Sequence, residues 1–233
     1  MHLEITLLGS GIAAAMLIVG AAIAYRWAPG DRTRSALQHL AAGVICAVTA
    51  AELVPEALKT ARGLDFSVGF VAGVALMLVA KALGERLSGE NSRGGFLVAT
   101  GLDVSIDGLL IGVAFSIGTD TGGLLVLAFT LELAALGLAL GASGTRSLRH
   151  SVGTAALLAL PVLPAAVVGQ LVVSQLPIAF RAGLVGFATA VLLYLVIEEL
   201  MSEAHEVEER PLATSLFFAG FLGLVLLQMQ ITD

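Results

Sequence analysis

Charged residues and cysteine are both scarce in this sequence. Only 13% of its 233 residues are Asp, Glu, Lys or Arg, whereas a typical soluble domain has about 25%. Together with a 58% share of hydrophobic residues and a mean hydropathy of +0.97, this scarcity excludes an ordinary water-soluble globular protein. The single cysteine, Cys46, excludes an intramolecular disulfide bond.

Two functional signatures are also missing. No Gly-x-x-x-x-Gly-Lys-[Ser/Thr] loop occurs, so the sequence offers no phosphate-binding loop for nucleotide hydrolysis. No basic cluster occurs either, and the net charge of −6 is spread over the polar segments. A nucleic-acid partner is therefore not expected.

Long hydrophobic runs fill most of the chain. A membrane-spanning helix needs about 20 mainly apolar residues. Eight runs meet this length, at roughly 3–25, 36–58, 66–86, 96–118, 122–142, 152–174, 177–202 and 211–230. The connections are short, and the first run lacks the basic start of a signal peptide. We therefore predict an all-α membrane protein with eight transmembrane helices, a single polytopic domain over residues 1–233 in the lipid bilayer.

The distribution of lysine and arginine predicts the orientation of these helices. Nine of these residues lie in or near the connections after spans one, three, five and seven, and three lie on the opposite side. Because basic residues favour the cytoplasmic side, both termini are expected to be extracytoplasmic. The expected location is a plasma membrane, in particular a bacterial inner membrane.

An internal repeat predicts two inverted halves. Each repeat has a Glu-Leu-x-x-Glu-Ala stretch and then a stretch rich in Phe and Gly, at 52–57 and 66–71 in the first and at 199–204 and 217–222 in the second. Spans two and seven run in opposite directions, which is typical of transporters with inverted repeats. The halves are then 1–90 and 150–233, on either side of a central helix pair at 94–145, in a 3+2+3 arrangement. Chance similarity of composition is the alternative.

Glycines and prolines predict details of helix packing. Three Gly-x-x-x-Gly pairs favour close approach of helix backbones; they are Gly69 and Gly73, Gly108 and Gly112, and Gly137 and Gly141. Pro161 and Pro164 predict a bend in span six.

The most unusual residues are two aspartates in the middle of the fourth apolar run. Asp103 and Asp107 are four residues apart, about one helical turn, so both carboxylates point to the same side of a helix. A charged side chain at the bilayer centre costs about 2.5–3.5 kcal/mol on insertion scales. Glu132 lies at a similar depth in the next run, so we expect the three carboxylates to converge near the midplane.

A bound divalent cation would resolve the electrostatics of such a cluster. Without a cation, crowded carboxylates repel each other and share protons as a coupled set. With a cation they ionise, so binding is expected to weaken as the pH falls. Oxygen ligands alone suit harder cations such as Mn²⁺ or Mg²⁺. The alternative is a protonated aspartate that only hydrogen-bonds a neighbouring helix.

More acids and two histidines lie toward the ends of spans two and seven. They are Glu52, Glu56, Glu198, Glu199, Glu203, His205 and His39. At these positions they predict a transport pathway for cations between the midplane and both membrane surfaces. Helix ends also carry solvated charges without any function, and that interpretation stays open for each of these residues.

At these residues the sequence resembles the ZIP (Zrt/Irt-like protein) family of divalent metal-ion transporters, over nearly its whole length. The similar segments are AAGVICAVTAAELVPEAL, GFVAGVALMLV, DGLLIGVAF, LGLALGAS and LLYLVIEELMSEAHE. The family has eight spans, outward termini and inverted halves around a central helix pair. The resemblance implies the same fold here, and a rocking or elevator movement of one helix bundle against the other.

The sequence departs from the family at its metal ligands, as a divergent member would. In the family's fourth-span motif His-Asn-x-Pro-Glu-Gly, Asp103 stands at the histidine and Asp107 at the glutamate. In span five Glu132 stands at the first ligand position, while Leu136 replaces a glutamate. Leu163 in span six stands where many relatives have a glutamate. The resemblance thus implies one metal site of three carboxylates instead of a two-metal centre.

Three functional hypotheses follow. The leading one is a transporter of divalent metal cations such as Mn²⁺, Fe²⁺, Zn²⁺ or Cd²⁺, without coupling to nucleotide hydrolysis. The second is a ZIP homologue that has lost metal transport and serves as a sensor, a partner subunit, or a carrier of another cation or of protons. The third, an intramembrane aspartyl protease, normally takes its aspartates from two different helices, so we expect no enzyme. A homodimer is left open.

Overall fold

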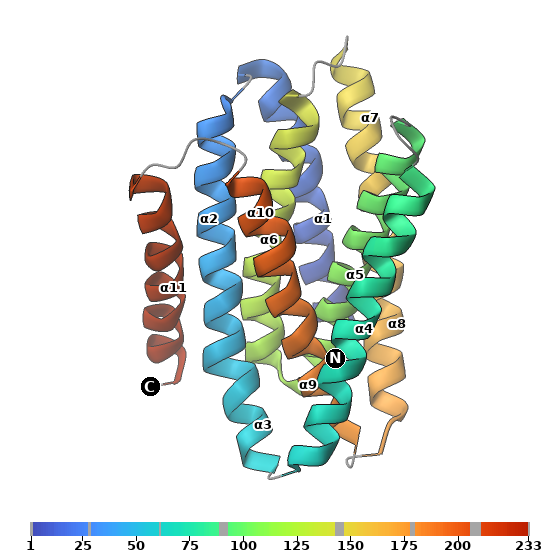
Figure 1. Cartoon of the computed structure of the whole chain (residues 1–233), viewed down its shortest axis with the longest axis vertical. Helices are drawn as coiled ribbons and strands as arrows, with labels where there is room; N and C mark the ends of the chain where they lie inside the picture. Colours follow the sequence, from blue (N-terminus) through green and yellow to red (C-terminus); the bar gives the residue numbers. More distant parts are fainter. Residues whose placement is uncertain are drawn as a thin grey trace.

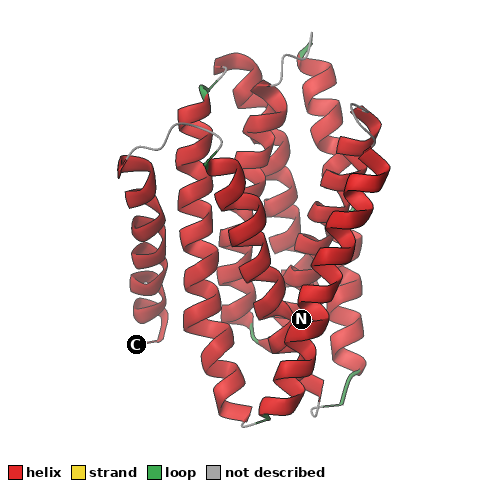
Figure 2. Ribbon diagram, viewed as in Figure 1, coloured by secondary structure: helices red, strands yellow, loops and turns green. Residues whose placement is uncertain are grey.

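Backbone hydrogen bonding explains why these apolar runs fold as helices. No water satisfies backbone N–H and C=O groups in lipid, so each span must satisfy them within itself. The computed structural model describes residues 2–27, 29–60, 62–88, 93–142, 147–177, 180–205 and 211–232. Helices account for nearly all of these residues, as Figure 2 shows.

The helices run up and down the long axis of the molecule (Figure 1). In chain order they are α1 (His2–Trp27), α2 (Asp31–Val48), η1 (Thr49–Leu53), α3 (Val54–Thr60), α4 (Gly63–Ser88), α5 (Arg93–Ile117), α6 (Thr119–Ala142), α7 (Leu148–Ala159), α8 (Val162–Gln175), α9 (Arg181–Tyr194), η3 (Leu195–Leu200), α10 (Met201–Ala204) and α11 (Pro211–Thr232). The segments η1 and η3 are π-helical: their backbone pairs residues five apart instead of four.

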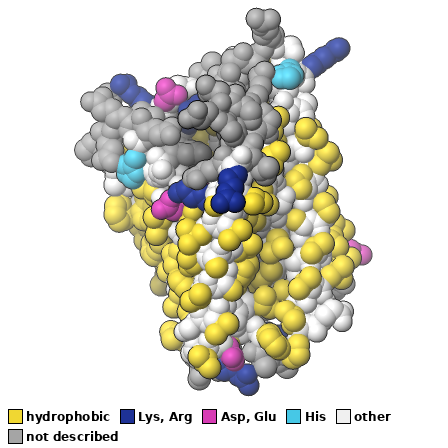
Figure 3. Space-filling view, turned by 45° about the vertical axis from the view of Figure 1, so that its right-hand side comes forward, with side chains coloured by type: hydrophobic (Ala, Val, Ile, Leu, Met, Phe, Trp, Pro, Cys, Tyr) yellow, Lys and Arg dark blue, Asp and Glu magenta, His cyan; other side chains and the backbone are white. Residues whose placement is uncertain are grey.

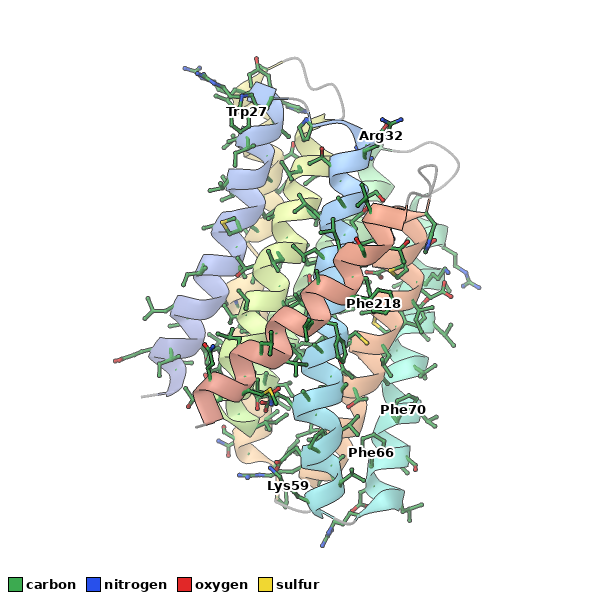
Figure 4. All side chains as sticks on the ribbon, turned by 90° about the vertical axis from the view of Figure 1, so that its left-hand side faces the viewer. Trp27, Arg32, Lys59, Phe66, Phe70 and Phe218 are labelled. Carbon is green, nitrogen blue, oxygen red and sulfur yellow. The ribbon has the colours of Figure 1, made fainter. Side chains whose placement is uncertain are left out.

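Eight segments of the described chain are long and apolar enough to cross a membrane, which confirms the predicted number. They are Leu3–Trp27, Asp31–Lys59, Gly63–Gly84, Leu97–Ile117, Thr119–Gly141, Leu148–Gln175, Arg181–Leu200 and Leu212–Gln230. On the face in Figure 3, apolar side chains cover the middle of the molecule. Trp27 and Arg32 lie at one end of the molecule and Lys59 at the other (Figure 4).

The predicted bend in span six is present at Pro161. Helix α7 ends at Ala159 and α8 begins at Val162. Proline ends a helix here because it lacks an N–H and its ring clashes with the preceding turn. Pro164 lies in the first turn of α8, where the missing N–H costs little.

Four pairs of helices lie closest together: α1 with α6, α5 with α8, α4 with α9, and α2 with α11. Glycines permit these approaches, which confirms the predicted packing of the Gly-x-x-x-Gly pairs. A Cβ added at Gly112 would collide with the Ala166 carbonyl oxygen, and one added at Gly69 would collide with the Gly183 carbonyl oxygen. At Gly137 it would meet the backbone of α1.

The four pairs form two groups that meet at the centre of the molecule. One group contains α1, α5, α6, α7 and α8, and the other contains α2, α4, α9 and α11. They meet where α2 packs against α6 and where α4 packs against α5. Fully buried side chains such as Phe129, Leu110 and Leu192 belong to the core that both groups share. Helices α4 and α11 are mostly exposed, as suits helices that face lipid.

Replacing Gly112 by alanine is expected to lower the unfolding temperature, because the added methyl group pushes against the α8 backbone. Overpacking of this kind costs about 1–3 kcal/mol. Thermal unfolding of the purified protein in detergent measures the change. Gly123→Ala is the matched control, since nothing lies within 4 Å of a Cβ added there. Equal unfolding temperatures for both variants would contradict the close contact between α5 and α8.

Candidate functional site

Two central helices position the three predicted midplane carboxylates. Asp103 and Asp107 lie on α5, and Glu132 lies on α6, which packs against α5. The structure brings the three side chains together: each offers one carboxylate oxygen, and these oxygens lie within 4.8 Å of one another. Oxygen ligands lie about 2.0–2.6 Å from Mg²⁺ or Ca²⁺. The spacing is therefore suitable for one shared cation.

The Asp107 carboxylate is the most deeply buried part of this cluster. It is fully buried, and neither oxygen has a hydrogen-bond partner in the described part of the chain. Its electrostatic neighbours are Glu132, Asp103 and Glu199, with Glu132 acting most strongly. A buried carboxylate without a partner is costly, and removal of its compensating charge is costlier still. A bound cation would relieve this cost, and so would protonation of the carboxyl group.

A fourth carboxyl group belongs to the cluster. Glu199 in η3 shares a side-chain hydrogen bond with Asp103. Two carboxyl groups can share such a bond only when one of them carries a proton, because a carboxylate is an acceptor only. The sequence predicted Glu199 as a pathway residue and not as a member of the cluster. Its position along the helix does not reveal the direction in which its side chain points. Ser105 instead donates to the Gly101 carbonyl of its own helix.

A pocket of about 320 Å³ adjoins these carboxyl groups. Asp103 and Glu199 line it together with Glu198 and Lys81, so its wall contains residues of α4, α5 and η3. The Lys81 ammonium lies 2.6 Å from a Glu198 oxygen, and both side chains are nearly half exposed, at 48% and 44%. The ion pair therefore marks where the pocket reaches the surface of the protein. Neither Lys81 nor the pairing of Glu198 was predicted from the sequence.

The two predicted histidines pack against each other beside the N-terminal half of α2. The rings of His39 and His205 lie 5.6 Å apart, edge to face. His39 is buried, its Nδ1 lies 2.8 Å from the Ser35 carbonyl oxygen, and the Ser35 hydroxyl donates to the Ala204 carbonyl oxygen. These contacts join α2 to α10. The side chain of Glu203 lies outside the described residues.

The predicted glutamates of span two lie near the opposite end of the bundle. Glu52 accepts hydrogen bonds from the Thr121 hydroxyl, at 3.0 Å, and from the Gln228 amide. Glu56 lies 3.3 Å from the Lys59 ammonium in an exposed pair. Both are thus held by neighbours outside the cluster of Asp107. Thr121 and Gln228 were not identified from the sequence, because single polar residues at helix ends carry no signal of their partners.

The two leucines that the resemblance places at ligand positions, Leu136 and Leu163, take part in apolar packing. Leu136 and Leu163 are partly buried against the hydrophobic core. They offer no ligand atom to the cluster. Among the described residues, the carboxylates of α5, α6 and η3 are consequently the groups that could form a cation site at this place.

No protein-family model matches the sequence, and no match to a curated protein was found. The function therefore has to follow from the geometry and chemistry of the carboxylate cluster.

Asp107→Asn is expected to raise the unfolding temperature in a buffer that contains a metal chelator. The substitution keeps the shape of the side chain but removes a buried charge among acids, and it adds an amide donor for their oxygens. Thermal unfolding in detergent is again the measurement. Asp120→Asn, at an exposed position in the first turn of α6, serves as control and should leave the unfolding temperature unchanged. A lower temperature for Asp107→Asn would mean that its charge is already compensated.

Proposed function

We propose that this chain is a transporter of divalent metal cations across a membrane, a divergent relative of the ZIP family that works without nucleotide hydrolysis. The observation that carries the proposal is the fully buried Asp107, whose oxygens lack hydrogen-bond partners within the described chain and whose neighbours are acids. Its cargo is a transition-metal ion such as Mn²⁺, Fe²⁺, Zn²⁺ or Cd²⁺.

The donor set supports a cation of this kind. Asp103, Asp107 and Glu132 supply only oxygen, which favours harder ions such as Mn²⁺ over ions that prefer thiolate ligands. The ionised carboxylates neutralise the charge of the ion, and the ion removes their mutual repulsion. Glu199 stands next to Asp103 on the side of the pocket, and we assign it and Glu198 to the path between the site and the surface.

Paired helix contacts support the inverted halves that the proposal includes. Helix α2 of the first half packs against α11 of the second half, and α9 of the second half packs against α4 of the first half. The central helices are paired in the same way, α6 with α1 and α5 with α8. Residues 1–90 and 150–233 are then the two halves around the central pair at 94–145. A rocking or elevator movement between them would expose the site to each side in turn.

The placement in the cell is also part of the proposal. The bias of lysine and arginine supports termini that lie outside a bacterial inner membrane. Trp27 and Arg32 then lie at the cytoplasmic end and Lys59 at the outer end (Figure 4). A homodimer is compatible with the exposed apolar faces of α4 and α11, but lipid covers such faces equally well.

One observation favours a second candidate, a carrier of protons or of another cation. The side chains of Asp103 and Glu199 are placed to share a hydrogen bond, and such a bond between two carboxyl groups requires a proton on one of them. Leu136 and Leu163 pack in the core where the family supplies glutamates. Transport measurements with metal ions separate the two candidates.

A crystallographic experiment tests the site. Crystals soaked separately in Mn²⁺, Fe²⁺, Zn²⁺, Co²⁺ and Cd²⁺ are expected to give one anomalous peak, in contact with Asp103, Asp107 and Glu132. The same peak should be missing in Asp107→Ala crystals. An ion bound elsewhere, or no ion with any of these metals, would refute the site.

Transport into proteoliposomes tests the function. We expect uptake of at least one of these metal ions, and a loss of at least about tenfold in Asp107→Asn, since one charged ligand contributes at least one factor of ten to ion binding. Asp120→Asn should transport like the unaltered protein. If no metal ion is taken up but an applied proton gradient dissipates, the second candidate is correct instead.

A further inference from the structure

Glu52 and Glu199 occupy matching positions in the two halves of the chain. Each is the residue before the leucine that ends a π-helical segment, Leu53 in η1 and Leu200 in η3. A π-helical turn inserts an extra residue into a helix and changes the direction of the side chains around it, and such turns are frequent at functional sites. The two Glu-Leu-x-x-Glu-Ala stretches thus share a local backbone geometry as well as a sequence.

The helices around these glutamates pack in a matching way. On α5, Gly108 and Gly112 approach the backbone of α8 at two residues that are four positions apart. On α6, Gly137 and Gly141 approach the backbone of α1 at two residues with the same separation. The glycines therefore provide a register for comparing the two central helices.

This register relates the carboxylates of the two central helices. Asp103 lies five residues before Gly108, and Glu132 lies five residues before Gly137. The counterpart of the contact between Asp103 and Glu199 would be one between Glu132 and Glu52, whereas Glu52 here contacts Thr121, eleven residues before Glu132 on α6. Asp107 corresponds to Leu136, so the carboxylate without partners lies in one half only.

The two halves are in different states in this structure. Glu199 shares a hydrogen bond with Asp103 and lines the pocket. Glu52 directs one oxygen to the Thr121 hydroxyl and the other to the Gln228 amide. Gln228 also donates to the Ala51 carbonyl oxygen at 3.3 Å. These two neutral donors, Thr121 and Gln228, thus hold the Glu52 carboxylate away from the carboxylate cluster.

We propose that Glu52 and Glu199 alternate as partners of the carboxylate cluster. In the state seen here Glu199 contacts the cluster through Asp103. It does so on the side where the pocket lies, and we name this side the pocket face. In the opposite state Glu52 leaves Thr121 and Gln228 and joins Glu132, and the cluster opens to the side of η1, which we name the η1 face. Transporters with inverted repeats exchange the conformations of their halves in this manner. The inference rests on the proposed transport function and names the residue that receives the cation at each face.

The test measures Mn²⁺ uptake from each face separately, in right-side-out and inside-out membrane vesicles that contain the full chain. Glu52→Gln is expected to raise the apparent KM for uptake from the η1 face by about tenfold, the effect of losing one charged ligand, and to leave the KM from the pocket face unchanged. Glu199→Gln should do the reverse. Glu56→Gln is the matched control for Glu52→Gln, because Glu56 lies one turn later and pairs with Lys59, and the exposed Asp120→Asn is the control for Glu199→Gln.

A second variant covers the case in which Glu52→Gln does not fold. Gln228→Leu removes a neutral donor that holds Glu52 in this state, so it should increase the population of the opposite state and lower the apparent KM at the η1 face. An unchanged or higher KM there would overturn the proposal.

The outcomes separate this inference from the proposed function. Absence of Mn²⁺ uptake by the unaltered protein from either face, together with absence of uptake of the other metal ions, refutes transport itself. Uptake that Glu52→Gln affects no more than Glu56→Gln, or that both variants impair at the same face, keeps the transport function and overturns the alternation of Glu52 and Glu199.

Discussion

The close contact between α5 and α8 determines where the carboxylates point. Gly108 and Gly112 face α8 so tightly that no side chain fits between the two backbones. Neighbouring residues on an α-helix point about 100° apart, so Asp107, which precedes Gly108, is turned away from α8 and toward the other central elements. Asp103 lies one turn earlier on the same side. The glycines thus orient the acids, although they make no contact with any ligand.

The same contact explains why the acidic cluster is tolerated in an apolar interior. The cluster lies where α5, α6 and η3 meet, inside the protein and not against lipid. Buried like charges are unfavourable wherever they occur, and here they have two means of compensation within reach, a proton between Asp103 and Glu199 or a cation among the oxygens. Within the described chain, Asp107 shares no hydrogen-bonded proton with a neighbouring acid. Its carboxylate is therefore the strongest indication of a ligand.

The sequence predicted the features that depend on composition and spacing along single helices. The eight apolar helices follow from run length, the break at Pro161 follows from proline chemistry, and the proximity of Asp103, Asp107 and Glu132 follows from their similar depth. Features that depend on contacts between distant helices could not be predicted. The contact between Glu199 and Asp103 requires that η3 lie beside α5, and the ion pair of Lys81 with Glu198 requires that α4 lie beside η3.

In the proposed transport, the ion pair of Lys81 and Glu198 also affects which ions use the pocket. The Lys81 ammonium is tethered at the mouth, so its effective concentration there is far higher than that of any free ion in solution. An ion that passes Glu198 has to compete with this resident single positive charge. An ion with two charges gains about twice the Coulomb energy from the same carboxylate. If cations take this path as proposed, the mouth of the pocket therefore favours divalent ions over monovalent ones before they reach Asp107.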